Sequence, residues 1–132
     1  YGAVSPEDGE LFSLVMPYTN TDCMNVFLEE LSKAYPDDYI LLLLDNAAWH
    51  RSSTMVVPSH IELFPLLPYT PELNPIEMIW DEVREKGFRN EIFKNLEAVI
   101  DRLCCTVKEL AEDVQCVASI THRRWLIDAL MI

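Results

Sequence analysis

The feature that most constrains the fold of this chain is an uninterrupted apolar run at residues 39–44, Tyr-Ile-Leu-Leu-Leu-Leu. Asp37 and Asp38 precede the run and Asp45 follows it. Hydrophobic periodicity alone does not distinguish a strand from a helix here, but the shortness of the run and its polar flanks favour a strand. Because no position in the run is polar, we expect both faces of this strand to be buried, as in a parallel sheet.

The segments around this run predict further strands and a helix. Residues 1–16 have the pattern of a β-hairpin. A helix is expected over residues 21–35, because Thr21 can cap it and apolar residues follow with helical spacing. Another short strand is expected over residues 61–64, ended by Pro65. A helix between a hairpin and a buried strand implies a crossover connection, and therefore an α/β domain.

The second half of the chain predicts helices. Asn74 is a preferred N-cap and Pro75 suits the first helical position, so a helix is expected from there to Gly87. A longer amphipathic helix is expected over residues 93–110, and a short one within 121–131.

Length and composition fit one folded domain. The 132 residues are half hydrophobic, which is enough to bury a core. We expect a single domain, with residues 1–66 forming the hairpin, helix and strands and residues 74–132 the C-terminal helices. No apolar run approaches the roughly 20 residues that span a bilayer, and the start has no signal-like segment, so we expect a cytoplasmic protein and no membrane partner. The four cysteines form no C-x-x-C pair, which favours buried thiols over a zinc site.

The net charge of −12 opposes binding to a polyanion. Residues 1–50 hold nine acidic residues and one basic residue, Lys33. Arg84, Lys86 and Arg89 cluster later in the chain, and they are the candidate DNA-binding surface. The alternative is a solvated helix face of mixed charge.

Two motifs carry the chemistry. Residues 44–50 read Leu-Asp-Asn-Ala-Ala-Trp-His, and residues 67–80 read Leu-Pro-Tyr-Thr-Pro-Glu-Leu-Asn-Pro-Ile-Glu-Met-Ile-Trp. Asp45 follows a buried strand, where ligands bind in open α/β sheets, although an Asp-Asn pair also starts turns. Glu77 lies in the first turn of a helix, where it could instead reach back to the backbone of the cap. Taken one at a time, both residues leave these alternatives open.

Together the motifs resemble the catalytic domain of the DDE transposases, specifically the insertion-sequence 630 branch of the Tc1/mariner superfamily, over about residues 1–93. The resemblance implies an RNase H-like α/β fold, a mixed sheet flanked by helices. In that family the first strand carries the first catalytic Asp, and no residue upstream of Tyr1 is present to supply it. We therefore expect a truncated domain that lacks the first strand.

The resemblance also implies a function. Such domains cut and join DNA at transposon ends by phosphoryl transfer that depends on Mg²⁺ or Mn²⁺, so Asp45 and Glu77 are the candidate catalytic residues and metal ligands. Asn46, His50 and Asn74 are expected to support these carboxylates. Without the first Asp the two-metal site is incomplete, and we expect this fragment to be inactive or nearly so by itself.

Partners follow from the same reading. Transposon-end DNA would be held by an N-terminal helix-turn-helix region of the full-length protein. Loss of the first strand would leave open edges on the hairpin and on the strand at 39–44, which predicts a homodimer. The alternative function is a noncatalytic transposase remnant that acts as a folded, dimerising interaction domain. A nuclease acting on RNA shares the carboxylates but lacks support from the Asn-Pro-Ile-Glu context.

Overall fold

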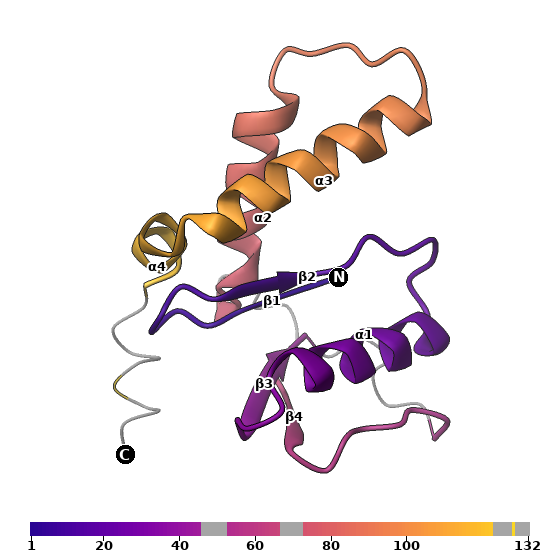
Figure 1. The fold of residues 1–132 in the computed structure, drawn as a ribbon, viewed down its shortest axis with the longest axis vertical. Helices are drawn as coiled ribbons and strands as arrows, with labels where there is room; N and C mark the ends of the chain where they lie inside the picture. Colours follow the sequence, from indigo (N-terminus) through magenta and orange to yellow (C-terminus); the bar gives the residue numbers. More distant parts are fainter. Residues whose placement is uncertain (46–52, 67–72, 123–127, 129–132) are drawn as a thin grey trace. The chain divides into compact units, whose positions relative to one another are not determined.

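The computed structural model describes residues 1–45, 53–66, 73–122 and 128, and it has the mixed α/β composition expected from the sequence (Figure 1). Its elements are β1 (Gly2–Val4), β2 (Leu11–Ser13), α1 (Thr21–Ala34), β3 (Ile40–Leu44), β4 (Ile61–Pro65), α2 (Ile76–Val83), the π-helical segment η3 (Arg84–Phe88), α3 (Leu96–Glu112) and α4 (Val114–Thr121).

The chain forms two compact units. One consists of Tyr1 and residues 16–74, and the other of residues 2–15 and 75–132. We name them the Asp45 unit and the Glu77 unit after the carboxylate that each contains. The hairpin, which we expected to group with α1 and the later strands, belongs with the C-terminal helices.

The Asp45 unit pairs β3 with β4 in parallel, from Ile40 opposite Ile61 to Leu44 opposite Pro65. Among the described residues this is a sheet of two strands, separate from the antiparallel sheet of β1 and β2. Helix α1 begins after Asn20, whose side-chain oxygen accepts a hydrogen bond from the Cys23 amide at 2.9 Å. The predicted cap, Thr21, is therefore wrong by one residue, because Asn20 is the residue with extended backbone before the helix.

The prediction that β3 is buried on both faces is wrong. On one face Leu44 and Ile61 are buried, whereas on the other Leu41 is 43% and Phe64 54% exposed. Buried residues of α1 contribute the rest of the apolar interior of this unit: Cys23, Met24, Phe27, Leu28 and Leu31. Although every residue of β3 is apolar, only one of its faces is covered.

Polar contacts fasten α1 to the strand region. The Nδ1–H group of His60 donates to the Asp38 carbonyl at 2.8 Å, so Nε2 is free to accept the Ser32 hydroxyl at 2.5 Å. The Asn25 side chain donates to the Thr54 carbonyl and accepts from the Val56 amide, at 3.1 and 2.8 Å. These bonds tie both the start of β4 and the segment before it to one helix.

The Glu77 unit has a continuous apolar core shared by the hairpin and the helices. Its buried members are Leu11, Ile76, Ile79, Val83, Val107, Leu110 and Val117. The hairpin turn packs tightly against α4: at Gly9, with φ of 78°, an added Cβ would lie 1.9 Å from the Val114 carbonyl oxygen. Only glycine fits at this position.

Helix boundaries in the Glu77 unit differ from the predictions. Gly87 does not end the helix that starts at Ile76 but lies within η3, where an added Cβ would meet the Thr106 hydroxyl oxygen at 2.5 Å. Helix α3 begins after Asn95, so Phe93 precedes it. Asp113 caps α4, a helix that the sequence did not predict. The helix expected within 121–131 lies almost entirely outside the described residues.

The structure bears on two expectations from composition, the burial of the cysteines and the absence of a membrane span. Of the cysteines, Cys23 is buried, Cys116 is half-buried, and Cys104 and Cys105 are exposed, so the prediction of buried thiols is wrong for α3. No helix in the described part of the chain is both long and apolar enough to cross a membrane.

Candidate functional site

Asp45 directly follows β3, and its side chain is exposed. The five apolar residues of β3, the last of which is the buried Leu44, fix the backbone that leads to it. Asn25 of α1 holds the segment before β4 through its bonds to Thr54 and Val56. The carboxylate therefore sits on the end of a rigid strand, which suits a metal ligand.

Glu77 lies in the first turn of α2, and its side chain is also exposed. The N-cap residue of this helix is Pro75, which has a helical backbone conformation. No side chain makes a capping hydrogen bond at this end of the helix. Proline has no N–H group, so a capping bond from Glu77 to this residue is impossible. Within the described residues no hydrogen bond or ion pair engages the Glu77 carboxylate, which leaves its oxygens available to a ligand.

Of the three residues expected to support the carboxylates, the structure describes one, Asn74. Asn74 is half-buried and immediately precedes the Pro75 cap, so its predicted role as the N-cap is wrong. Asn46 and His50 lie outside the described residues. Their roles stay predictions.

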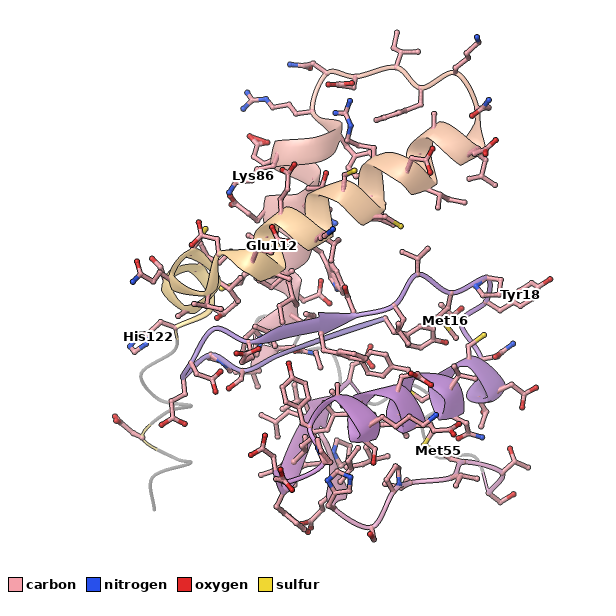
Figure 2. All side chains as sticks on the ribbon, viewed as in Figure 1. Met16, Tyr18, Met55, Lys86, Glu112 and His122 are labelled. Atoms are coloured by element: carbon pink, nitrogen blue, oxygen red, sulfur yellow. The ribbon has the colours of Figure 1, made fainter. Side chains whose placement is uncertain are left out.

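The basic cluster is locally neutralised. Arg84 pairs with Asp81, Lys86 with Glu82 at 3.2 Å, and Arg89 with Glu85 at 2.6 Å. The side chains are 66%, 52% and 67% exposed, and Lys86 projects outward (Figure 2). The Glu82 carboxylate, which accepts a hydrogen bond from Lys86, raises the pKa of that lysine. Each of the three cations therefore already has a carboxylate partner.

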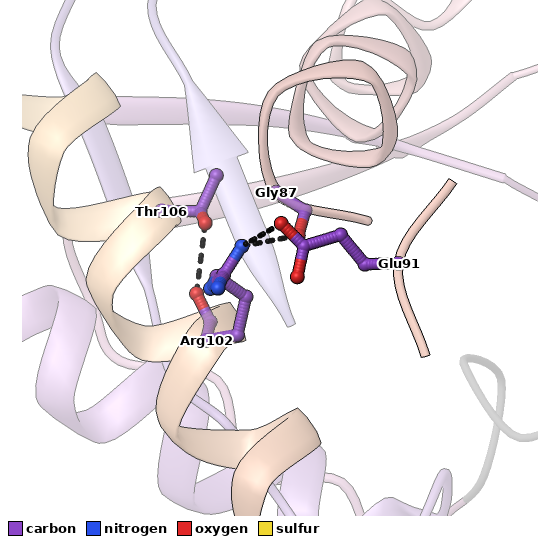
Figure 3. A network of polar contacts seen from close by, with 4 residues as sticks. All are labelled: Gly87, Glu91, Arg102 and Thr106. Carbon is purple, nitrogen blue, oxygen red and sulfur yellow. Dashed lines mark hydrogen bonds and ion pairs between the residues drawn. The ribbon is translucent and has the colours of Figure 1, made fainter. Parts of the chain in front are cut away.

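The turn that carries these basic residues is fastened to α3 by Arg102. Its Nη1 donates to the Gly87 carbonyl and to the Glu91 carboxylate, both at 3.0 Å (Figure 3). Its guanidinium also lies over the Phe93 ring. The Thr106 hydroxyl in turn donates to the Arg102 carbonyl at 2.8 Å. Sequence reasoning missed Arg102 and Asn25, since neither belongs to a motif and only the tertiary contacts give them a role.

The donor chemistry of the two carboxylates fits Mg²⁺, which prefers hard oxygen ligands and keeps several waters. Asp45 and Glu77 belong to different units, and each is described within its own. Among the described residues, no group of three or more His, Cys, Asp or Glu side chains could hold a metal ion.

A separate open depression of about 520 Å³ occurs in the Glu77 unit, and it contains neither Glu77 nor any of the basic cluster. Its lining residues are Pro6, Glu7, Gln115, Ala118, Ser119 and His122.

Comparisons with known proteins give two matches. Residues 1–100 match the model of the family described as DDE superfamily endonuclease. The uncharacterized protein y4pE/y4sA of Sinorhizobium fredii (strain NBRC 101917 / NGR234) is 35% identical over 126 residues, which cover 95% of this chain and 93% of that protein. No solved structure matches. The range matched by the family includes both Asp45 and Glu77.

Proposed function

This chain belongs to the DDE superfamily endonucleases, and we propose that it is part of a bacterial transposase that cuts and joins DNA at transposon ends. The observation that carries the proposal is the family match over residues 1–100, which includes both motif carboxylates. We assign it to the insertion-sequence 630 branch of the Tc1/mariner superfamily and to the RNase H-like fold on the motifs alone.

In this proposal Asp45 and Glu77 would hold Mg²⁺ or Mn²⁺. The metal ions would lower the pKa of the attacking hydroxyl and neutralise charge on the leaving oxygen. The protein's own contribution is placement: β3 carries one carboxylate at its end, and the first turn of α2 presents the other, which has no competing bond from any residue that the structure describes.

A complete DDE site has a third carboxylate, and the proposal assigns none of these 132 residues to it. We therefore expect weak or absent cleavage by this chain alone. An Asp on an added N-terminal strand, or one from another chain, would complete the site.

The test is Mn²⁺-dependent nicking of supercoiled plasmid by the 132-residue chain, alone and with the family's first strand joined before Tyr1. Asp45→Asn and Glu77→Gln should abolish nicking by the extended protein. Asp38→Asn, which alters the carboxylate before β3, and Glu97→Gln, in the first turn of α3, are matched controls that should retain it. Nicking that survives both motif variants would overturn the assignment.

DNA contact by Arg84, Lys86 and Arg89 is a separate part of the proposal. Each cation would exchange its carboxylate partner for a phosphate, so the net gain is small. Replacing all three by Met should weaken DNA binding and flatten its salt dependence, as measured by fluorescence anisotropy between 50 and 200 mM salt, the range over which phosphate contacts lose roughly 10³–10⁵ in affinity. Unchanged affinity would place the DNA surface elsewhere.

A further inference from the structure

The segment between η3 and α3, residues 88–95, folds into an ordered turn, which we name the 88–95 turn. The Glu91 amide donates to the Phe88 carbonyl at 3.4 Å. Asn90 has a left-handed backbone conformation, with φ of 57°, which asparagine adopts more readily than most residues. At the other end of the turn the Asn95 side chain caps α3. Hydrogen bonds therefore shape the turn at both ends.

Three side chains of the 88–95 turn hold it together and fasten it to α3. The centroids of the Phe88 and Phe93 rings lie 5.3 Å apart, and the Arg102 guanidinium lies 5.6 Å from the centroid of Phe93. Glu91 is the third, since its carboxylate accepts a hydrogen bond from Arg102 at 3.0 Å. An aromatic contact, a cation–π contact and a charged hydrogen bond thus order the turn before any partner binds.

Other side chains of the turn project into solvent. Ile92 is 99% exposed, more than any other large apolar side chain that the structure describes. Arg89, Asn90 and Lys94 on either side of it are also exposed. Arg89 pairs with Glu85, whereas Lys94 makes no ion pair with any described residue. An isoleucine that stays hydrated on an ordered turn contributes no burial to the fold, which points to a role in binding.

The charge of the 88–95 turn indicates the kind of partner. Glu91 is the one carboxylate within residues 88–95, and Arg102 pairs with it. The turn therefore offers two cations and an amide around an apolar side chain, on a chain whose net charge is −12. Proteins that kink DNA combine the same groups: Arg, Lys and Asn contact the minor groove, and an apolar wedge such as Ile partly unstacks a base step.

We propose that the 88–95 turn binds duplex DNA from the minor groove and kinks it, with Ile92 as the wedge and with Arg89 and Lys94 on the flanking phosphates. The proposal rests on the proposed function for its partner, DNA, but it requires neither metal nor cleavage. It adds to the basic cluster a contact that salt does not screen, because burial of Ile92 between bases is apolar. Lys94 can bind phosphate without leaving a carboxylate of the described residues, unlike Arg89.

The experiment measures affinity by fluorescence anisotropy, and bending by energy transfer between dyes at the two ends of a duplex of roughly 25 base pairs. Two duplexes are compared, one with central pyrimidine–purine steps, which unstack easily, and one with a central A-tract, which is stiff. We expect the 132-residue chain to bend the first duplex and to bind it about tenfold more tightly than the second.

The opposite preference would overturn the wedge, because the narrow minor groove of an A-tract attracts cations and favours a contact made by charge alone. Binding to the flexible duplex without a bend would also overturn it, and so would no binding at about 50 mM salt. A metal chelator is present throughout, so the result is independent of cleavage. Bending by a chain that fails the nicking assay supports the turn and counts against the metal site, whereas nicking without bending counts against the turn alone.

Substitutions separate the wedge from the cation. Ile92→Ala should keep the fold, because the side chain is 99% exposed, and should weaken binding to the flexible duplex about tenfold and remove most of the bend. Val114→Ala shortens another exposed apolar side chain, on α4 at the end of the unit away from the turn (Figure 1), and should bind and bend like the wild type. Equal bending by Ile92→Ala and this control would contradict the wedge.

The cation is tested by the salt dependence of binding. Lys94→Met should leave the bend at saturating protein unchanged and should lower the slope of log affinity against log salt concentration by about 1. Lys108→Met, which removes an exposed lysine from α3, is the matched control that should keep the wild-type slope. Equal slopes for the two variants would remove Lys94 from the proposed contact.

Discussion

The Asp45 unit and the Glu77 unit each present one carboxylate but are stabilised differently. The Glu77 unit buries one apolar cluster that joins hairpin and helices, from Leu11 to Val117. The Asp45 unit buries α1 residues and one face of its sheet, and it adds side-chain bonds to backbone from Asn25 and His60. The comparison shows that core packing supports both site ligands, whereas in the Asp45 unit polar bonds also hold the segment that follows the ligand, so the two units should respond differently to loss of a polar contact.

The largest effects are expected from a fully buried apolar side chain in each unit. Leu28 in α1 and Ile79 in α2 are both 0% exposed. Leu28→Ala and Ile79→Ala should each lower the free energy of unfolding by about 2–5 kcal/mol, because each leaves a cavity. Amide hydrogen exchange should accelerate only in the unit that carries the substitution. Acceleration throughout the chain after either change would show that the units unfold as one.

A smaller effect is expected from the bonds that Arg102 makes in the Glu77 unit. Arg102→Met should lower the free energy of unfolding by about 1–2 kcal/mol, since it removes charged hydrogen bonds to Gly87 and Glu91 that are only partly exposed. Arg84→Met is the matched control, because it removes an exposed pair within one helix and should cost about 0.5 kcal/mol or less. Urea denaturation measures both, and equal losses would mean that the contact with α3 contributes nothing.

The corresponding polar contact in the Asp45 unit is Asn25. Asn25→Ala should cost about 0.5–1.5 kcal/mol, the usual net value of a hydrogen bond. Its specific signature is faster exchange of the Val56 amide, which loses its acceptor. Asn95→Ala, which removes a helix cap in the Glu77 unit, should leave that amide unchanged. A Val56 amide that exchanges equally slowly in the Asn25 variant would argue against this contact.

The smallest effect concerns pH. Glu82 raises the pKa of Lys86 above its ordinary value of 10.5, so the pair contributes stability that is fully present below pH 10.5 and lost as pH rises through the raised pKa. Because the lysine is half exposed, the contribution is at most a few tenths of a kcal/mol. Thermal melting of the wild type and of Lys86→Met should converge above that pH, and a difference that widens there would contradict the sign.

The sequence predicted the element order well because its strongest signals are local. The apolar run became β3, the motif after Asn74 led into α2, and turn residues marked the hairpin. Caps were harder, since Asn20 and Thr21 have similar propensities and only the backbone conformation distinguishes them. At Pro75 the predicted first helical residue became the cap itself.

What the sequence could not give was set by contacts between distant residues. Glycine commonly follows the last residue of a helix, but Gly87 lies inside η3, packed closely against Thr106. The open face of β3 reflects which elements cover it, which an apolar run does not reveal. For the site, the motifs named Asp45 and Glu77, whereas the ion pairs of the basic cluster and the contacts of Asn25 and Arg102 emerge only from the fold.

The close packing of Gly9 on α4 has a consequence for the order in which the chain can fold during synthesis. The Asp45 unit, apart from Tyr1, is one continuous stretch, residues 16–74, and it can close as soon as β4 has left the ribosome. The hairpin is made before this stretch, but a two-stranded hairpin alone is only marginally stable. It must wait for α4, against which its turn packs, so these strands are translated before the Asp45 unit and become native after it.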